Sequence, residues 1–303
     1  MRVGSKTTFV NLPEAVIPAF LRAIRVNRPF LTAEGAAEEV RKQELRPGSY
    51  SPRKKLHPDV AVSVRRHSGR PVYTVAPTGS TPSGEVIYVH GGGWVHEINP
   101  YQWALIAQVA AEANTRVTVP IYELLPYGSA VSTNEFIVDL FEDVKTEHNE
   151  VRLAGDSAGG QIALSAALTL RDRGHADIRT VLISPPLDLT LSNPDIGGVL
   201  PKDPWLAVEG IRAVAKRWAG DLPITDPKIS PLLGDFDGLG PILLLTGTHE
   251  ILNPDAHLLV SKARAAGVEV TLLERDAAVH AFPLLPTRPA AAARARIVAA
   301  LRA

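Results

Sequence analysis

A short glycine-rich motif at residues 155–160, Gly-Asp-Ser-Ala-Gly-Gly, holds the strongest chemical signal in the sequence. An apolar run precedes it and a helical pattern follows it, and Gly-x-Ser-x-Gly in such a strand–turn–helix context is a nucleophile elbow. Gly155 and Gly159 remove side chains that would collide in so tight a turn. The N–H groups that open the following helix would stabilise an oxyanion. The motif therefore predicts Ser157 as a nucleophile.

A second motif, residues 90–94, reads His-Gly-Gly-Gly-Trp and also follows an apolar run. Three consecutive glycines expose bare backbone N–H groups, which suit an anion cradle. Alone, the run fits a flexible loop equally well, but the nearby elbow favours an oxyanion loop. A phosphate loop is disfavoured because no Gly-Lys-Ser/Thr follows, and the spacing of a dinucleotide fingerprint is missing.

A nucleophilic serine needs a base, and the sequence has nine histidines. His280 is the preferred candidate because it follows the predicted strand 268–273, in a loop at the end of that strand. His249 and His257 are rivals. His90 is a further rival, but it adjoins the glycine run and is better explained as a brace for that loop.

The base needs an orienting carboxylate, and the loop after the predicted strand 242–245 offers Glu250 and Asp255. The order serine, acid, histidine is the order of the α/β-hydrolases. Glu250 comes first after the strand and is preferred on position. Asp255 follows Pro254 where a helix should begin, so N-capping would explain it.

The elements around these residues alternate between apolar runs and helical patterns. An antiparallel pair is expected near Val60–Val64 and Val72–Val75, followed by buried strands at 86–89, 117–121, 151–154, 181–183, 242–245 and 268–273. Helices are expected near 16–24 and at 32–44, 101–114, 134–148, 159–173, 208–218, 255–266 and 289–301. Buried strands that alternate with helices predict a mostly parallel sheet covered on both faces.

One stretch interrupts this alternation. Residues 190–223 contain no good strand, only a loop rich in Pro, Gly and Asp followed by a helix. We interpret this stretch, together with residues 1–50, as a helical cap over the carboxyl edge of the sheet, where open α/β sheets bind ligands. Residues 51–189 and 224–303 would then form the catalytic domain.

Composition excludes several classes of protein. The 303 residues carry 32 Lys+Arg against 32 Asp+Glu, so a nucleic-acid partner is not expected. The absence of cysteine excludes a disulfide scaffold, a thiolate metal site and a cysteine nucleophile. No apolar run reaches the roughly 18 residues of a membrane span, and the stretch 15–24 does not resemble a signal peptide. We expect a cytoplasmic protein with no cofactor, metal or membrane partner; a homodimer stays open.

Together these motifs resemble the hormone-sensitive-lipase-like family of microbial carboxylesterases, in the α/β-hydrolase superfamily. The resemblance rests on residues 90–94 and 155–160, on Ile-Ser-Pro-Pro-Leu-Asp at 183–188 and on His-Ala-Phe at 280–282, and extends from about residue 60 to the end. Among subgroups, the chain is most similar to the monoterpene ε-lactone hydrolases. The resemblance implies an α/β-hydrolase fold, a mostly parallel central sheet with helices on both faces and a helical cap.

By this resemblance, Ser157 is the nucleophile, His280 the base and Glu250 the acid. The oxyanion hole is implied at the N–H groups of Ala158 and of two among Gly91, Gly92 and Gly93. The chain departs from the family twice. Glu250 stands where the family usually has an aspartate, and Tyr127 replaces the glutamate that usually follows a proline.

Other residues near the motifs have competing interpretations. Asp156 and Asp188 are expected to hold loops by hydrogen bonds. Trp94 would line a substrate pocket or fill the core beside the glycine run. Trp205 and Trp218 would be either cap core or substrate wall; Trp94 and Trp205 are our candidates for substrate binding.

The predicted function is a serine carboxylesterase that hydrolyses short-to-medium-chain esters or lactones through an acyl-enzyme. A small-molecule ester or lactone is the expected partner. Two alternatives remain, an amidase or carbamate hydrolase with the same apparatus, and a non-catalytic small-molecule receptor on the same fold.

Overall fold

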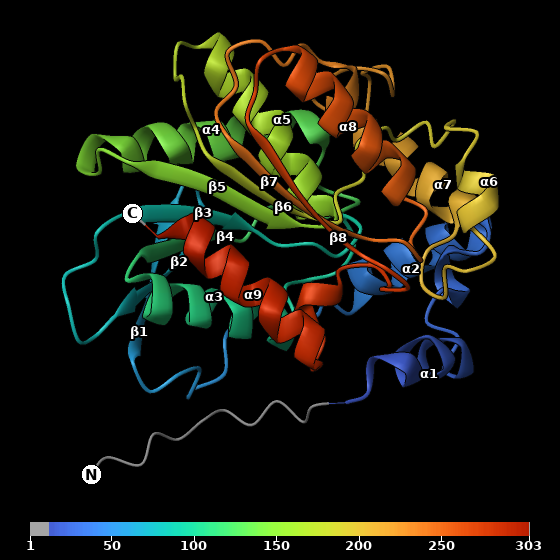
Figure 1. Ribbon diagram of the computed structural model, residues 1–303, viewed down its shortest axis with the longest axis horizontal. Helices are drawn as coiled ribbons and strands as arrows, with labels where there is room; N and C mark the ends of the chain where they lie inside the picture. The colour runs from blue at the N-terminus through green and yellow to red at the C-terminus, as the bar shows by residue number, and fades with distance from the viewer. Residues whose placement is uncertain (1–11, 303) are drawn as a thin grey trace.

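A single twisted sheet of eight strands forms the centre of the computed structural model, which describes residues 12–302 (Figure 1). The strands are β1 (Val60–His67), β2 (Arg70–Pro77), β3 (Glu85–Val89), β4 (Arg116–Pro120), β5 (Val151–Asp156), β6 (Thr180–Ile183), β7 (Ile242–Gly247) and β8 (Val270–Arg275). Their order is β1-β2-β4-β3-β5-β6-β7-β8. β1, β2 and β4 pair antiparallel, and every pair from β4 to β8 is parallel. This confirms the predicted α/β-hydrolase fold.

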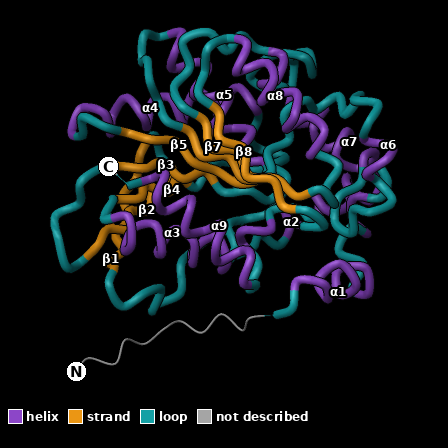
Figure 2. The backbone as a smooth tube through the Cα atoms, in the orientation of Figure 1, coloured by secondary structure: helices purple, strands orange, loops and turns teal. Residues whose placement is uncertain are grey.

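Helices cover both faces of the sheet (Figures 1 and 2). One face carries α3 (Pro100–Ala113) and α9 (Arg288–Leu301), which pack against each other. The other face carries α4 (Ala130–Glu147), α5 (Ala158–Asp172) and α8 (Asn253–Ala265). Strands β3, β5, β6 and β7 are buried along their whole length, as near-continuous apolar strands between two helical layers should be.

The remaining helices gather at one end of the sheet. They are α1 (Ile17–Ala23), α2 (Ala33–Leu45), α6 (Ile196–Val199) and α7 (Val208–Ala219), with a 3₁₀ turn at Arg28–Phe30. α2 packs on α7. The 3₁₀ turn approaches α7 so closely that a Cβ added at Gly210 would lie 2.2 Å from the carbonyl oxygen of Phe30. The two segments predicted as a cap therefore touch each other; residues 1–11 of that prediction lie outside the described residues.

Two helices, α4 and α8, begin two or more residues before their predicted starts. α4 begins at Ala130, four residues before the predicted start, because Ser129 and Ser132 form a reciprocal capping box. α8 begins at Asn253, so Asp255 lies inside the first turn. Leu252 occupies the N-cap position and no side chain caps the helix, so the N-cap interpretation of Asp255 was wrong.

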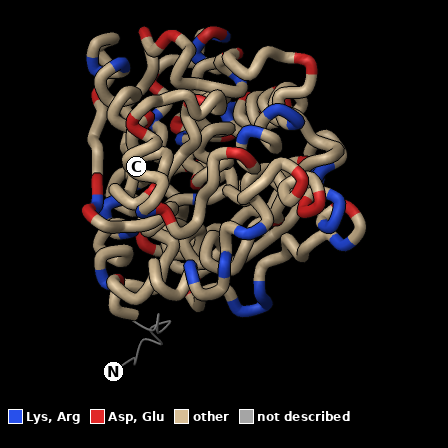
Figure 3. The backbone as a smooth tube through the Cα atoms, turned by 90° about the vertical axis from the view of Figure 1, so that its right-hand side faces the viewer, with Lys and Arg blue, Asp and Glu red and all other residues tan. Residues whose placement is uncertain are grey.

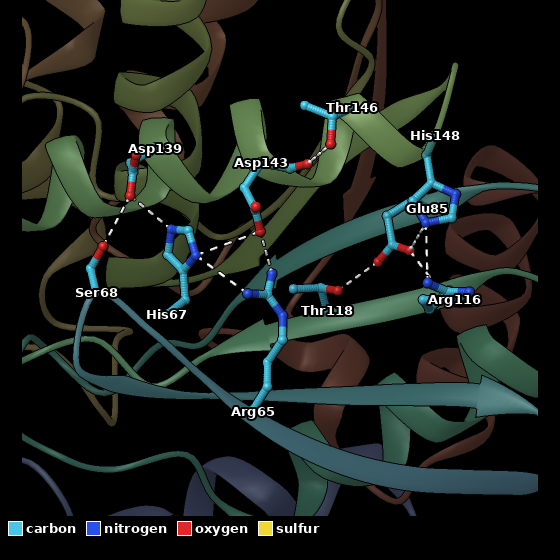
Figure 4. Close-up of polar contacts among 10 residues, drawn as sticks. All are labelled: Arg65, His67, Ser68, Glu85, Arg116, Thr118, Asp139, Asp143, Thr146 and His148. Carbon is cyan, nitrogen blue, oxygen red and sulfur yellow. Dashed lines mark hydrogen bonds and ion pairs between the residues drawn. The ribbon is translucent and has the colours of Figure 1, made fainter.

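Lys and Arg residues are interspersed with Asp and Glu residues on the side of the molecule shown in Figure 3. At the sheet edge, Arg65 and His67 of β1 reach Asp143 and Asp139 of α4 at 2.6 and 2.8 Å (Figure 4). Among residues 12–302, none of the helices combines the length and the apolar character that a bilayer crossing requires.

Candidate active site

The predicted elbow is a strained turn between β5 and α5. Ser157 has φ 51° and ψ −128°, a conformation that a side-chain-bearing residue rarely adopts. A Cβ at Gly155 would lie 2.4 Å from the carbonyl oxygen of Gly159, and one at Gly159 would lie 2.1 Å from that of Val89. Only glycine fits at either position, so these two residues permit the turn that presents Ser157 above the sheet.

Three side chains from distant parts of the chain meet at this turn. His280 Nε2 lies 2.9 Å from Ser157 Oγ, although 123 residues separate them. His280 Nδ1 lies 2.6 Å from Glu250 Oε2. His280 is 4% exposed and Glu250 is completely buried. A hydroxyl, an imidazole and a carboxylate thus form one continuous hydrogen-bonded series, with the imidazole and the carboxylate buried and the hydroxyl partly exposed to the cavity.

The Glu250 carboxylate is held on its other oxygen. Oε1 accepts hydrogen bonds from the hydroxyls of Thr246 and Ser184 at 2.7 and 2.8 Å, and from the N–H of Gly247 at 2.8 Å. The hydroxyl of Ser184 in turn accepts the N–H of Ala281, the residue after His280. These bonds satisfy a buried charge and orient it toward the imidazole.

Opposing influences act on the pKa of His280. Burial alone would lower it, because burial disfavours the charged imidazolium. The hydrogen bond to Glu250 and the charge of that carboxylate, with smaller contributions from Asp203 and Asp156, raise the pKa above its usual value. Glu250 therefore stabilises the imidazolium that forms when His280 takes up a proton.

The three glycines after His90 have different surroundings. The N–H of Gly91 donates to Asp156 Oδ1 at 3.1 Å, so it is already engaged. Gly92 and Gly93 have φ of +133° and +62° and line the cavity in front of Ser157. The N–H groups of Gly92, Gly93 and Ala158 have no acceptor within residues 12–302, and they remain available to a ligand.

Asp156 fixes the glycine loop to the elbow, as its expected structural role requires. Its buried carboxylate accepts the hydroxyl of Tyr88 at 2.8 Å and the side-chain amide of Gln102 at 2.9 Å, besides the N–H of Gly91. Burial raises the pKa of Asp156, and these hydrogen bonds act against that rise. Asp188, the other acid expected to hold a loop, accepts the N–H of Thr190.

The rival candidates lie elsewhere. Asp255 accepts the Asn193 amide at 2.8 Å, and burial raises its pKa to about 6. His90 is fully buried and stacked on Tyr122 with ring centroids 4.6 Å apart, and burial lowers its pKa to about 4. His257 pairs with Glu274 at the surface. The backbone N–H of His249 donates to the carbonyl oxygen of Ala278 at 2.9 Å.

A cavity of about 400 Å³ lies above Ser157 and His280. Trp205 lines it and meets the His280 ring edge to face at 5.8 Å. Trp94 is almost fully buried yet also reaches the cavity, and it stacks on Trp218 at 6.0 Å. Trp218 does not line the cavity, so its core interpretation fits. Tyr127 is 74% exposed and lies outside the cavity.

Sequence reasoning missed Asp203. This buried residue of the 190–223 segment accepts the N–H groups of Trp205 and Leu206 through Oδ1, at 2.8 and 2.9 Å. Its Oδ2 accepts the N–H of Ile251, directly after Glu250, at 2.9 Å. Asp203 thereby ties the segment that carries Trp205 to the loop that carries Glu250. The Asp203–Pro204 dipeptide is a local signal for the turn, but nothing near it in the sequence marks the contact with Ile251, which lies 48 residues away.

The chain is similar to known proteins in sequence and in fold. A family model for the alpha/beta hydrolase fold matches residues 86–284. LipR of Mycobacterium tuberculosis is 30% identical over 267 residues, which cover 86% of this chain and 84% of that protein. A solved esterase from the bacterial hormone-sensitive lipase family is 25% identical with a TM-score of 0.81, covering 97% of this chain and 98% of the other.

Two further relatives are longer than the region they share with this chain. The triacylglycerol lipase of M. tuberculosis is 28% identical over 228 residues, which span 74% of this chain but 47% of the lipase. The esterase of Acinetobacter venetianus is 29% identical over 61% of this chain and 63% of its own length. The chain belongs to the family of alpha/beta hydrolase fold proteins, and the predicted kinship with the hormone-sensitive-lipase-like esterases is confirmed.

Proposed function

We propose that this protein is a serine carboxylesterase that hydrolyses short-to-medium-chain esters or lactones through an acyl-enzyme. The observation that carries the proposal is the series Ser157–His280–Glu250, with links of 2.9 and 2.6 Å, facing a cavity that exposes free backbone N–H groups. Ser157 is the nucleophile, His280 the base and Glu250 the orienting acid. The backbone N–H groups of Gly92, Gly93 and Ala158 form the oxyanion hole. The N–H of Gly91 instead holds the glycine loop in place through its bond to Asp156.

Acylation begins when Ser157 Oγ attacks the ester carbonyl carbon and its proton moves to His280 Nε2. The carbonyl oxygen becomes an oxyanion, which the three N–H groups stabilise at the start of α5, where the helix dipole is positive. Glu250 stabilises the imidazolium that forms. The tetrahedral intermediate then expels the alcohol, which takes the proton from His280 as the carbon–oxygen bond breaks.

Deacylation repeats these steps with water. His280 removes a proton from water as the water oxygen attacks the acyl carbon, and the same N–H groups hold the second oxyanion. Cleavage of the bond to Ser157 Oγ releases the carboxylic acid, and His280 returns the proton to the serine. The chain's own residues supply every proton transfer in this cycle.

The substrate class follows from the cavity and its covering helices. Residues 12–50 and 190–223 form the helical cap in this proposal, and they supply apolar lining from Val26, Phe30, Leu206 and Ile211. A volume of about 400 Å³ is at the small end of ligand pockets and suits a compact ester or lactone.

Active-site labelling tests the serine mechanism. A fluorophosphonate should modify Ser157 alone, with the label located by mass spectrometry of the digested protein, and Ser157→Ala should not react. A receptor without catalysis would not be labelled. Turnover of an ester and of its matched amide separates an esterase from an amidase, and we expect the ester to react faster.

A chain-length series tests the substrate class. With p-nitrophenyl esters of about two to sixteen acyl carbons, kcat/KM should be highest in the short-to-medium range that the cavity accommodates. A maximum at the longest chain would contradict this part of the proposal and leave the serine mechanism intact.

A further inference from the structure

One polar side chain in the catalytic cavity lacks a partner. The polar or charged side chains that line the cavity are those of His96, Glu97, Asn99, Gln102, Asp156, Ser157 and His280. Within residues 12–302, neither carboxylate oxygen of Glu97 forms a hydrogen bond or ion pair, and Oε2 is buried from solvent. A buried polar group without a partner is rare enough in folded proteins to call for an explanation.

The polar neighbours of Glu97 are already committed to other groups. His96 Nε2 contacts the Glu39 carboxylate at 3.0 Å. Asn99 caps α3 by accepting the N–H groups of Tyr101 and Gln102. The Gln102 side chain accepts the N–H of Asn99 at 2.7 Å and donates to Asp156. These polar neighbours in the catalytic cavity are therefore engaged with other groups and do not pair with Glu97.

The Glu97 side chain is partly exposed, but its Oε2 is buried, and the stem of the side chain is in van der Waals range of the Gly48 backbone. Burial raises the pKa of the carboxyl to about 7, and no neighbouring positive charge acts against this rise. An unpaired acid in such a place costs folding stability, so a ligand that supplies the missing partner would be bound strongly.

Glu97 also occupies a particular place in the cavity system. A second cavity of about 230 Å³ lies beside the catalytic one, bordered by Glu44, Pro47, Leu124 and Tyr127. Glu97 is the residue common to the two linings. Glu97 thus lies in the lining of the catalytic cavity, on the side where the second cavity adjoins it.

We propose that Glu97 is a specificity-determining residue that binds a hydrogen-bond donor, a hydroxyl or an ammonium group, on the ester substrate. The proposal rests on the esterase function proposed above and narrows its substrate class to esters with a polar donor remote from the scissile bond. A metal ion is a poor alternative occupant, because no three His, Cys, Asp or Glu side chains gather to hold one within the described part of the chain.

Matched substrates test this inference. On the acyl side, methyl heptanoate is compared with methyl ω-hydroxyhexanoate and methyl ω-aminohexanoate; on the alcohol side, heptyl acetate is compared with ω-hydroxyhexyl and ω-aminohexyl acetate. Each set keeps chain length and changes only the terminal group. A hydrogen bond to a charged group predicts a kcat/KM ratio of about tenfold or more for a donor ester over its apolar match in at least one set.

Substitutions at Glu97 test whether its carboxylate causes the preference for donor esters over their apolar matches. Glu97→Met keeps the bulk but removes hydrogen bonding, so the ratio should fall to about one. Glu97→Gln keeps hydrogen bonding without charge, so it should retain part of a hydroxyl preference and lose an ammonium preference. Glu44→Gln is the matched control, because Glu44 borders only the second cavity and should leave every ratio unchanged.

The outcomes separate this inference from the function on which it rests. Absence of turnover of p-nitrophenyl acetate by the unmodified protein would overturn the proposed function. Normal turnover of p-nitrophenyl acetate with equal donor and apolar rates, or with a donor preference that survives Glu97→Met, would overturn the role of Glu97 alone. A melting temperature of Glu97→Met at or above that of the unmodified protein shows that any lost preference is not due to misfolding.

Discussion

The wall of the cavity that the sheet supplies presents side chains held by buried hydrogen bonds, whereas the wall supplied by the proposed cap presents mainly apolar side chains, with Asp203 as its hydrogen-bonded anchor. On the sheet side, Glu250 Oε1 alone accepts three hydrogen bonds, and Asp156 accepts bonds from three separate residues. On the cap side, Val26, Phe30 and Ile211 line the cavity through apolar surface.

This difference extends to the outer surface of the cap. α1 buries Ile17 and Leu21 against Val279, but Phe20 within the helix and Ile24 at its C-cap are 58% and 54% exposed. Hydrogen bonds are directional, so they place a reacting atom narrowly, while apolar burial is non-directional and tolerates displacement. We therefore expect changes on the sheet wall to reduce kcat and changes on the cap wall to act mainly on KM.

The largest effect should come from the nucleophile. Ser157→Ala removes the attacking oxygen and should lower kcat by about 10⁴–10⁶, leaving the contribution of the oxyanion hole and of binding. Steady-state ester hydrolysis measures this loss. The exposed hydroxyl of Ser51 offers a matched control, and Ser51→Ala should keep full activity. Near-normal turnover by Ser157→Ala would end the serine mechanism.

The next effect tests the acid of the sheet wall. Glu250→Gln keeps the shape of the side chain but removes the charge that orients and stabilises His280, so kcat should fall by about 10²–10⁴. Asp255→Asn is the control, because Asp255 binds Asn193 and not the imidazole. If Asp255→Asn lost this activity and Glu250→Gln did not, the assignment of the acid would be wrong.

Acidification should reduce activity more gradually. His280 acts as a base only when neutral, so activity is present above its pKa and is lost as pH falls through it. Because Glu250 raises that pKa, the acid limb of kcat/KM should lie above the usual value of 6.5, and Glu250→Gln should move it to lower pH. A pH–rate profile measures both positions. A rate that stayed flat down to about pH 4 would contradict a histidine base.

The smallest effect should appear on the cap wall. Trp205→Ala removes an aromatic surface from the cavity, and KM should rise about tenfold with a much smaller change in kcat. Leu200→Ala in the same segment is a control, since Leu200 is partly exposed and does not line the cavity. If Trp205→Ala lost as much kcat as Glu250→Gln, then Trp205 would orient His280. The cap wall would then affect kcat as the sheet wall does, and the expected difference between the two walls would be wrong.

Much of the sheet wall could be predicted because its signals are local. The strained turn at Ser157 needs glycines at two neighbouring positions, and the strands show apolar runs that match burial on both faces. The predicted strands 242–245 and 268–273 were enough to place Glu250 and His280 in the loops that follow the ends of these strands. The helix starts were less predictable, because the Ser129 capping box and the helix start at Asn253 depend on a few residues with weak apolar patterning.

The sequence by itself indicated the reaction chemistry that we propose, since a nucleophile elbow and a glycine run are short segments marked by their own residues. Only the tertiary structure decided which groups complete the site. In the described residues, the N–H of Gly91 donates to Asp156, and Asp255 accepts from Asn193 and does not contact His280. Oε2 of Glu97 is buried there without a hydrogen-bond partner. Each of these outcomes depends on packing between segments far apart in the chain, which no local pattern of residue types encodes.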